Sequence, residues 1–145
     1  MNFDTIIQQF HTQGIRLYEC STPGVLSRLE RRCHFKFPGS FTQFYLQANG
    51  FEDEAWTANM FSLWSLEKIG AEYEERLVRF GSIATFIPFC DYLIQSHLIG
   101  FLPNQLGIYK LYGSATAQTE AEIIPLCETF EQVLAWIASG AIELF

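Results

Sequence analysis

Several residue types that perform acid–base or nucleophilic chemistry occur in this sequence, but their spacing matches no catalytic motif. Asp91 lies at the end of a predicted strand, where a carboxylate could exchange protons with a substrate. The same position suits a residue that caps a turn, and this is the interpretation that we favour. Cys33 and His34 could form a nucleophile–base pair with Cys90 or Cys127 only through proximity in the fold. Buried free cysteines more often act as small apolar residues.

Metal and phosphate sites are not indicated either. The histidines have neither HxxxH nor HExxH spacing, and the cysteines form no CxxC pair. The glycines form no G-x-G-x-x-G or Walker pattern that could hold a phosphate. The sequence therefore predicts a protein that is not an enzyme and that uses no metal ion and no cofactor.

The charge of the chain is unevenly distributed. The formal net charge is -7; residues 1–50 hold five basic and three acidic residues, and residues 51–145 hold four basic and thirteen acidic ones. Binding to nucleic acid requires clustered Lys and Arg, so we expect no direct contact with nucleic acid. An acidic protein instead attracts a basic partner. The alternative is that the charges only keep an aromatic-rich chain in solution.

The strongest candidate for a binding site is a short acidic segment. Glu52, Asp53 and Glu54 are consecutive and Trp56 follows them closely, so carboxylates could pair with a basic partner while the indole anchors in a pocket. A solvated loop with the indole folded into the core is the alternative. Four further glutamates, on a predicted helix over residues 65–80, could extend the negative surface or could simply be solvated. They are Glu67, Glu72, Glu74 and Glu75.

A predicted helix within residues 37–51 directly precedes the acidic segment. Phe41, Phe44, Tyr45 and Ala48 recur at helical spacing and predict the buried face. Pro38 can occupy the first helical position, or Ser40 can cap the helix in a box with Gln43. Asn49 and Gly50 tolerate the left-handed conformation that ends many helices.

Other patterns predict the remaining elements. Apolar periodicity predicts helices near residues 3–13, 23–33, 65–80 and 129–140; Thr22 with Pro23 and Thr129 with Gln132 form expected N-caps. Apolar or alternating runs predict strands over residues 60–64, 84–89, 92–95, 97–102, 106–112 and 123–126. Pro88 suits an edge strand or a strand end.

The order of these elements predicts an α+β fold. We expect one domain over residues 1–145, with a largely antiparallel mixed sheet of about four to six strands flanked by helices. The N-terminus does not resemble a signal peptide, and no apolar run reaches the roughly 18 residues of a membrane span. We therefore expect a cytoplasmic protein with reduced thiols and no membrane contact.

An ordered set of motifs resembles the SUKH superfamily over about residues 23–140. The stretch from Phe37-Pro38 to Asn49-Gly50 resembles the family's central motif, in which a proline-initiated, aromatic-rich helix ends in Asn-Gly. Residues 86–91 (Phe-Ile-Pro-Phe-Cys-Asp) are similar to a family strand, residues 107–109 (Gly-Ile-Tyr) to a later strand, and residues 124–134 to the terminal strand and helix. The chain differs in having Phe51 where a second glycine is common, and residues 91–95 in place of a glycine-rich turn.

The resemblance implies a mixed α/β domain without catalytic activity. Many bacterial members of the superfamily are immunity proteins that bind and neutralise a toxin domain, often a nuclease, and fungal relatives are regulatory scaffolds. We therefore expect a protein-binding domain, with a basic toxin domain as the leading partner. A general regulatory scaffold without a toxin partner is the alternative.

Overall fold

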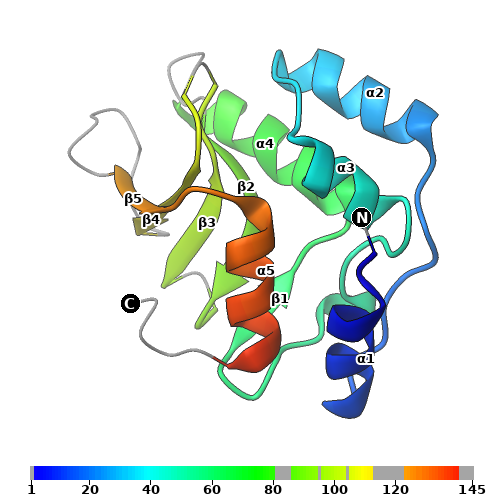
Figure 1. Cartoon of the computed structure of the whole chain (residues 1–145). Coiled ribbons are helices and arrows are strands. Elements are labelled where there is room, and N and C mark those ends of the chain that lie inside the picture. The colour runs from blue at the N-terminus through cyan, green and yellow to red at the C-terminus, as the bar shows by residue number, and fades with distance from the viewer. Residues whose placement is uncertain (1, 81–85, 95, 104, 113–122, 141–145) are drawn as a thin grey trace.

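The chain folds into five α-helices, one short 3-10 helix and a five-stranded sheet within the part that the structure describes (Figure 1). The computed structural model describes residues 2–80, 86–94, 96–103, 105–112 and 123–140. The α+β prediction is confirmed. In chain order the elements are α1 (Asp4–Thr12), α2 (Pro23–Cys33), α3 (Gly39–Tyr45), the 3-10 helix η1 (Glu52–Glu54), β1 (Phe61–Leu63), α4 (Leu66–Phe80), β2 (Ile87–Tyr92), β3 (His97–Phe101), β4 (Ile108–Tyr112), β5 (Ile123–Cys127) and α5 (Phe130–Ser139).

The strands form an antiparallel meander in the order β1-β2-β3-β4-β5. One predicted strand is wrong: Tyr92 ends β2, and Leu93 and Ile94 form a turn in which both residues have a φ of 52°. Gln95 and residues 84–85 of the predicted strands lie outside the described residues. Pro88 lies within β2 rather than at its end, but β1 pairs only with the other half of β2, so no ladder bond to β1 needs the missing N–H.

The third helix is shorter than its sequence pattern predicts. It ends at Tyr45, and the next two residues form a turn. Pro38 is the N-cap residue rather than the first helical residue, and no side chain caps this end, so the predicted box between Ser40 and Gln43 does not form. The predicted buried face is nevertheless correct, because Ala48 also remains buried after the helix has ended.

Side-chain capping at two other helices agrees with the sequence. Thr22 accepts a hydrogen bond from the Val25 N–H at the start of α2. Thr129 and Gln132 form the reciprocal capping box at the start of α5, and Gly140 ends that helix in the left-handed conformation. These two helices are therefore encoded locally.

Aromatic rings fill the space between the helices and the sheet. The ring of Phe41 lies within 6 Å, centroid to centroid, of rings from α3, β2, β3 and α5. Figure 1 shows α5 crossing in front of the sheet, with α3 beside it and α1 below. The helix α4 contacts both β2 and α2. None of the described helices is long and apolar enough to cross a membrane.

Candidate functional site

The acidic segment begins where the chain leaves the core and is held at its root by backbone hydrogen bonds. Leu17 and Phe51 form an antiparallel bridge, and the Glu52 N–H donates to the Arg16 carbonyl over 2.8 Å. On the other side, the Phe51 N–H donates to the Leu63 carbonyl of β1 over 2.8 Å. The segment therefore emerges from a backbone that is fixed on both sides.

Asn49 and Gly50 join this root to the start of α4. The Asn49 Oδ1 accepts a hydrogen bond from the Leu66 N–H (2.9 Å), and its Nδ2 donates to Glu67 Oε1 (2.7 Å). Gly50 has a φ of 80°, and a Cβ there would lie 2.5 Å from the Trp64 carbonyl carbon. The Asn-Gly pair therefore caps the start of α4 and admits close backbone packing. The prediction that this pair ends the third helix is wrong, because α3 already ends at Tyr45.

The acidic segment itself is a single 3-10 turn with an unusual residue at its centre. Asp53 has φ 54° and ψ 31°, which is the left-handed region that Asp and Asn tolerate better than most residues. Its N–H donates to the Tyr18 hydroxyl (3.3 Å). Asp53 is exposed and Glu52 is half-buried, and neither carboxylate has an ion-pair partner among the described residues. Trp56 is half-buried; the side chain of Glu54 lies outside the described part of the structure.

Two of the glutamates of α4 lie beside basic residues. Glu74 is paired with Arg32 of α2 (3.0 Å), and Glu75 lies 3.8 Å from Arg79 on the same helix. At 100° per residue, Glu72 and Glu75 project to sides of α4 different from that of Glu74. The pKa of Arg76 is lowered, mainly by burial and also by the charge of Arg79. The Glu72 carboxylate partly offsets this shift.

Glu67 is connected to the root of the turn, because its carboxylate accepts a hydrogen bond from Asn49. It is exposed, but that bond holds its carboxylate toward Asn49. Of the predicted binding residues, Glu52 and Asp53 are thus adjacent carboxylates without an ion-pair partner among the described residues.

Two residues beside the turn were not predicted as part of the site. Tyr18 holds the Asp53 backbone, and the Lys68 ammonium lies 5.0 Å from the centroid of the Trp64 ring. Both line a cavity of about 70 Å³ together with Phe51 and Ser62. This cavity is too small for a ligand of ordinary size. Apolar and polar residues alternate over residues 15–18, which indicates an extended segment. The alternation does not indicate that this segment, which contains Tyr18, pairs with Phe51.

The carboxylate and thiols that could take part in catalysis are buried: Asp91, Cys33 and Cys90. Asp91 is buried near the end of β2, opposite Ser62 of β1 and Leu98 of β3, so its carboxylate is not exposed to a substrate. Burial raises the pKa of the Cys33 thiol to about 12, and burial, assisted by Asp91, raises the pKa of the Cys90 thiol further. Both thiols are therefore protonated near neutral pH and are poor nucleophiles.

The histidines also lie apart. His34 is the exposed residue that ends α2, with a φ of 51°, and His97 begins β3. Burial and the charge of Lys110 lower the pKa of His97. His11 is exposed in the last turn of α1. Within the described ranges, no group of three or more His, Cys, Asp and Glu side chains could hold a metal ion.

Comparison with known proteins assigns the chain to a family. Residues 21–136 match the SMI1 / KNR4 family (SUKH-1), a range that begins just before α2 and ends within α5. The match includes the Asn-Gly element, the acidic turn and the complete sheet. No curated protein matches the chain at a significant level. Because the family match covers most of its length, this chain belongs to the SMI1 / KNR4 family (SUKH-1).

Proposed function

We propose that this protein is a non-enzymatic immunity protein that binds and neutralises a toxin domain with a basic surface, such as a nuclease. The observation that carries the proposal is the acidic turn, where Glu52 and Asp53 have no ion-pair partner among the described residues. Its fixed root means that little conformational entropy is lost when a partner binds. Family membership is consistent with this role.

The chemistry of the turn favours recognition of cations. Two adjacent carboxylates can accept charge-assisted hydrogen bonds from Lys or Arg, the residues that a nuclease uses to hold phosphate. The half-buried Trp56, three residues beyond Asp53, offers an aromatic surface for the centre of such an interface. The net charge of -7 adds long-range attraction, which accelerates association at low ionic strength.

The test begins with the gene immediately upstream, which should encode a large toxin. Its purified C-terminal domain is the binding probe, and affinity and rates are measured by surface plasmon resonance. The double variant E52Q/D53N should bind at least about tenfold more weakly, because two charge-assisted contacts are lost. Asn is chosen at position 53 because it tolerates the left-handed backbone.

The matched control is E75Q, which also removes a carboxylate charge but from a residue that lies 3.8 Å from Arg79 on α4. It should leave the affinity within about twofold of the wild type. Equal affinities of E52Q/D53N and the wild type would remove the acidic turn from the interface. No binding of the toxin domain by the wild-type protein would contradict the immunity function and would favour a regulatory scaffold.

A further inference from the structure

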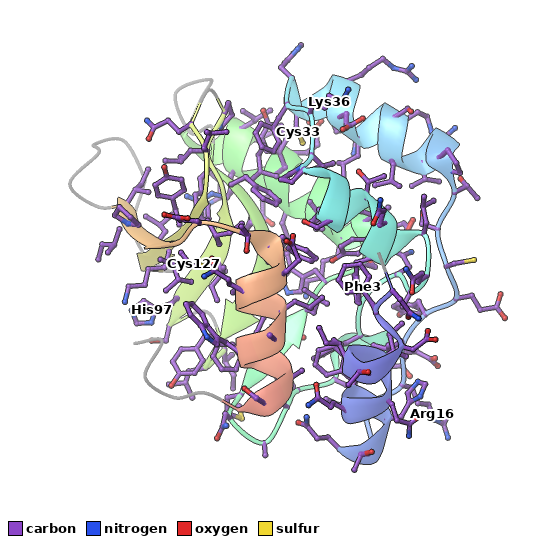
Figure 2. All side chains as sticks on the ribbon, in the orientation of Figure 1. Phe3, Arg16, Cys33, Lys36, His97 and Cys127 are labelled. Carbon is purple, nitrogen blue, oxygen red and sulfur yellow. The ribbon has the colours of Figure 1, made fainter. Side chains whose placement is uncertain are left out.

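A groove of about 720 Å³ lies between β4, β5 and the starts of α3 and α5, away from the acidic turn. Its walls are mainly apolar and come from distant parts of the chain. Figure 2 labels Cys127, which lines the groove, to the left of α5, and Arg16, whose carbonyl binds the acidic turn, to the lower right. The groove and the acidic turn are therefore two separate surfaces. The principal apolar side chains of the groove are Pro38, Phe101, Leu106, Tyr109, Leu126 and Phe130.

Specific contacts fix the backbone at the β4 side of the groove. The Tyr109 hydroxyl donates to the Leu106 carbonyl over 2.7 Å, which fixes the turn before β4. Gly107 has a φ of 100°, and a Cβ there would lie 3.1 Å from the Cys127 carbonyl oxygen, so the two segments approach closely at this point. The Leu106 side chain is nevertheless 95% exposed. An exposed apolar side chain beside an apolar groove is consistent with an interaction site.

The charges at the rim of the groove specify the partner's chemistry. Glu128 and Glu131 line it, neither has an ion-pair partner among the described residues, and no described Lys or Arg lines it. The N–H groups of Glu128 and Thr129 at the start of α5 are occupied, because they donate to the Gln132 side chain. These features favour a cation at the rim and do not favour an anion.

We propose that this groove binds an extended segment of a partner protein in which an apolar side chain lies next to Lys or Arg. The apolar side chain would pack against Leu106 and Leu126, and the cation would meet Glu128 and Glu131. Within the described sheet β5 is one of the two edge strands, but Pro125 has no N–H to offer. Recognition therefore depends on side chains more than on strand addition. This site goes beyond the proposed function, because it does not require that the partner be a toxin.

The experiment uses the whole chain, labelled with ¹⁵N, and a capped synthetic hexapeptide of alternating leucine and lysine. Titration should produce saturable chemical-shift changes around Leu106, Leu126 and Thr129. The same peptide with glutamate in place of lysine should bind at least about tenfold more weakly, because two rim contacts become repulsive. Equal binding of the two peptides would overturn the charge assignment.

Variants of the protein locate the binding surface. E128Q/E131Q and Leu106→Asn should each weaken binding of the lysine peptide at least about fivefold. Leu106 is 95% exposed, so its replacement leaves the fold intact, and the amide spectrum confirms this directly. E52Q/D53N, which tests the proposed function, should leave peptide binding unchanged.

Two further outcomes would overturn the inference. Shift changes that centre on the acidic turn would mean that the peptide follows general charge attraction. Concentration-dependent shifts in the groove without peptide would mean that a second copy of the chain occupies it.

Discussion

At the scale of single residues, Asn49 and Gly50 perform tasks that depend on a segment about 15 residues later in the chain. Asn49 satisfies the Leu66 N–H at the start of α4, and Gly50 lies directly against the Trp64 backbone. The Trp64 carbonyl also accepts a hydrogen bond from the buried Tyr45 hydroxyl over 2.6 Å. Asn and Gly are thus required here by three-dimensional contacts as well as by local backbone geometry.

Gly50→Ala should lower the free energy of unfolding by about 2 kcal/mol or more. A side chain at a φ of 80° is strained, and its Cβ would overlap the Trp64 backbone, which cannot rotate away. Chemical denaturation followed by circular dichroism measures the change. Gly39→Ala is the matched control, because a Cβ there meets no atom within 4 Å; it should change stability by less than about 0.5 kcal/mol. Equal effects of the two variants would contradict the close packing of Gly50.

At the scale of elements, the turn between β2 and β3 carries strain that the sequence does not reveal. Leu93 and Ile94 both have a φ of 52°, a conformation in which hairpins normally place Asn and Gly. For a β-branched side chain this is an outlier. The family commonly has a glycine-rich turn at this point, so the chain keeps the hairpin geometry with residues that are poorly suited to it. Ile94 is also 72% exposed and gains little from packing.

Replacing Ile94 should therefore separate backbone strain from side-chain packing. Ile94→Gly and Ile94→Ala remove nearly the same exposed apolar surface, but only glycine relieves the positive φ. The glycine variant should be more stable than the alanine variant by about 1 kcal/mol, even though glycine raises the entropy of the unfolded chain. Thermal unfolding of both variants gives the comparison, and a less stable glycine variant would show that the turn is not strained.

At the scale of the whole molecule, basic and acidic groups gather in different regions. The basic residues of α2 include Arg31 and Arg32 in its last turn, whereas unpaired carboxylates lie at the acidic turn and at the rim of the groove. The four cysteines are free and differ in burial. The rate at which each thiol reacts therefore measures how tightly the protein is packed around it.

Thiol labelling at about pH 8 should modify Cys20 first, because this side chain is exposed. Burial raises the pKa of the Cys33 thiol to about 12 and that of Cys127 to a lesser extent. A raised pKa leaves the thiol protonated at this pH, so Cys33 and Cys90 should react only after unfolding in guanidinium. Mass spectrometry of the alkylated protein counts the modified thiols, and Cys20→Ser should abolish the fast reaction. Fast labelling of Cys33 in the native protein would contradict the buried core.

The sequence predicts most elements because their signals are local. The periodicity of residues 65–80 predicts α4, and the Thr129–Gln132 box predicts the start of α5 within one turn, since a cap depends only on its own neighbours. The predicted strand over residues 92–95 is wrong because a hairpin turn made of Leu and Ile has the composition of a strand. The sequence also does not predict that Asp91 is buried, because a buried carboxylate within a strand has no local signature.

The sequence by itself determined the family, the α+β class, the buried aromatic face of α3 and the location of the acidic segment. Only the tertiary structure decided which carboxylates remain unpaired. Glu74 meets Arg32, 42 positions away, whereas Glu52 and Asp53 meet no described cation. The groove at β5 likewise arises from residues that lie far apart in the chain. Backbone periodicity and capping act within a few residues, but ion pairs and cavities depend on which distant segments pack together.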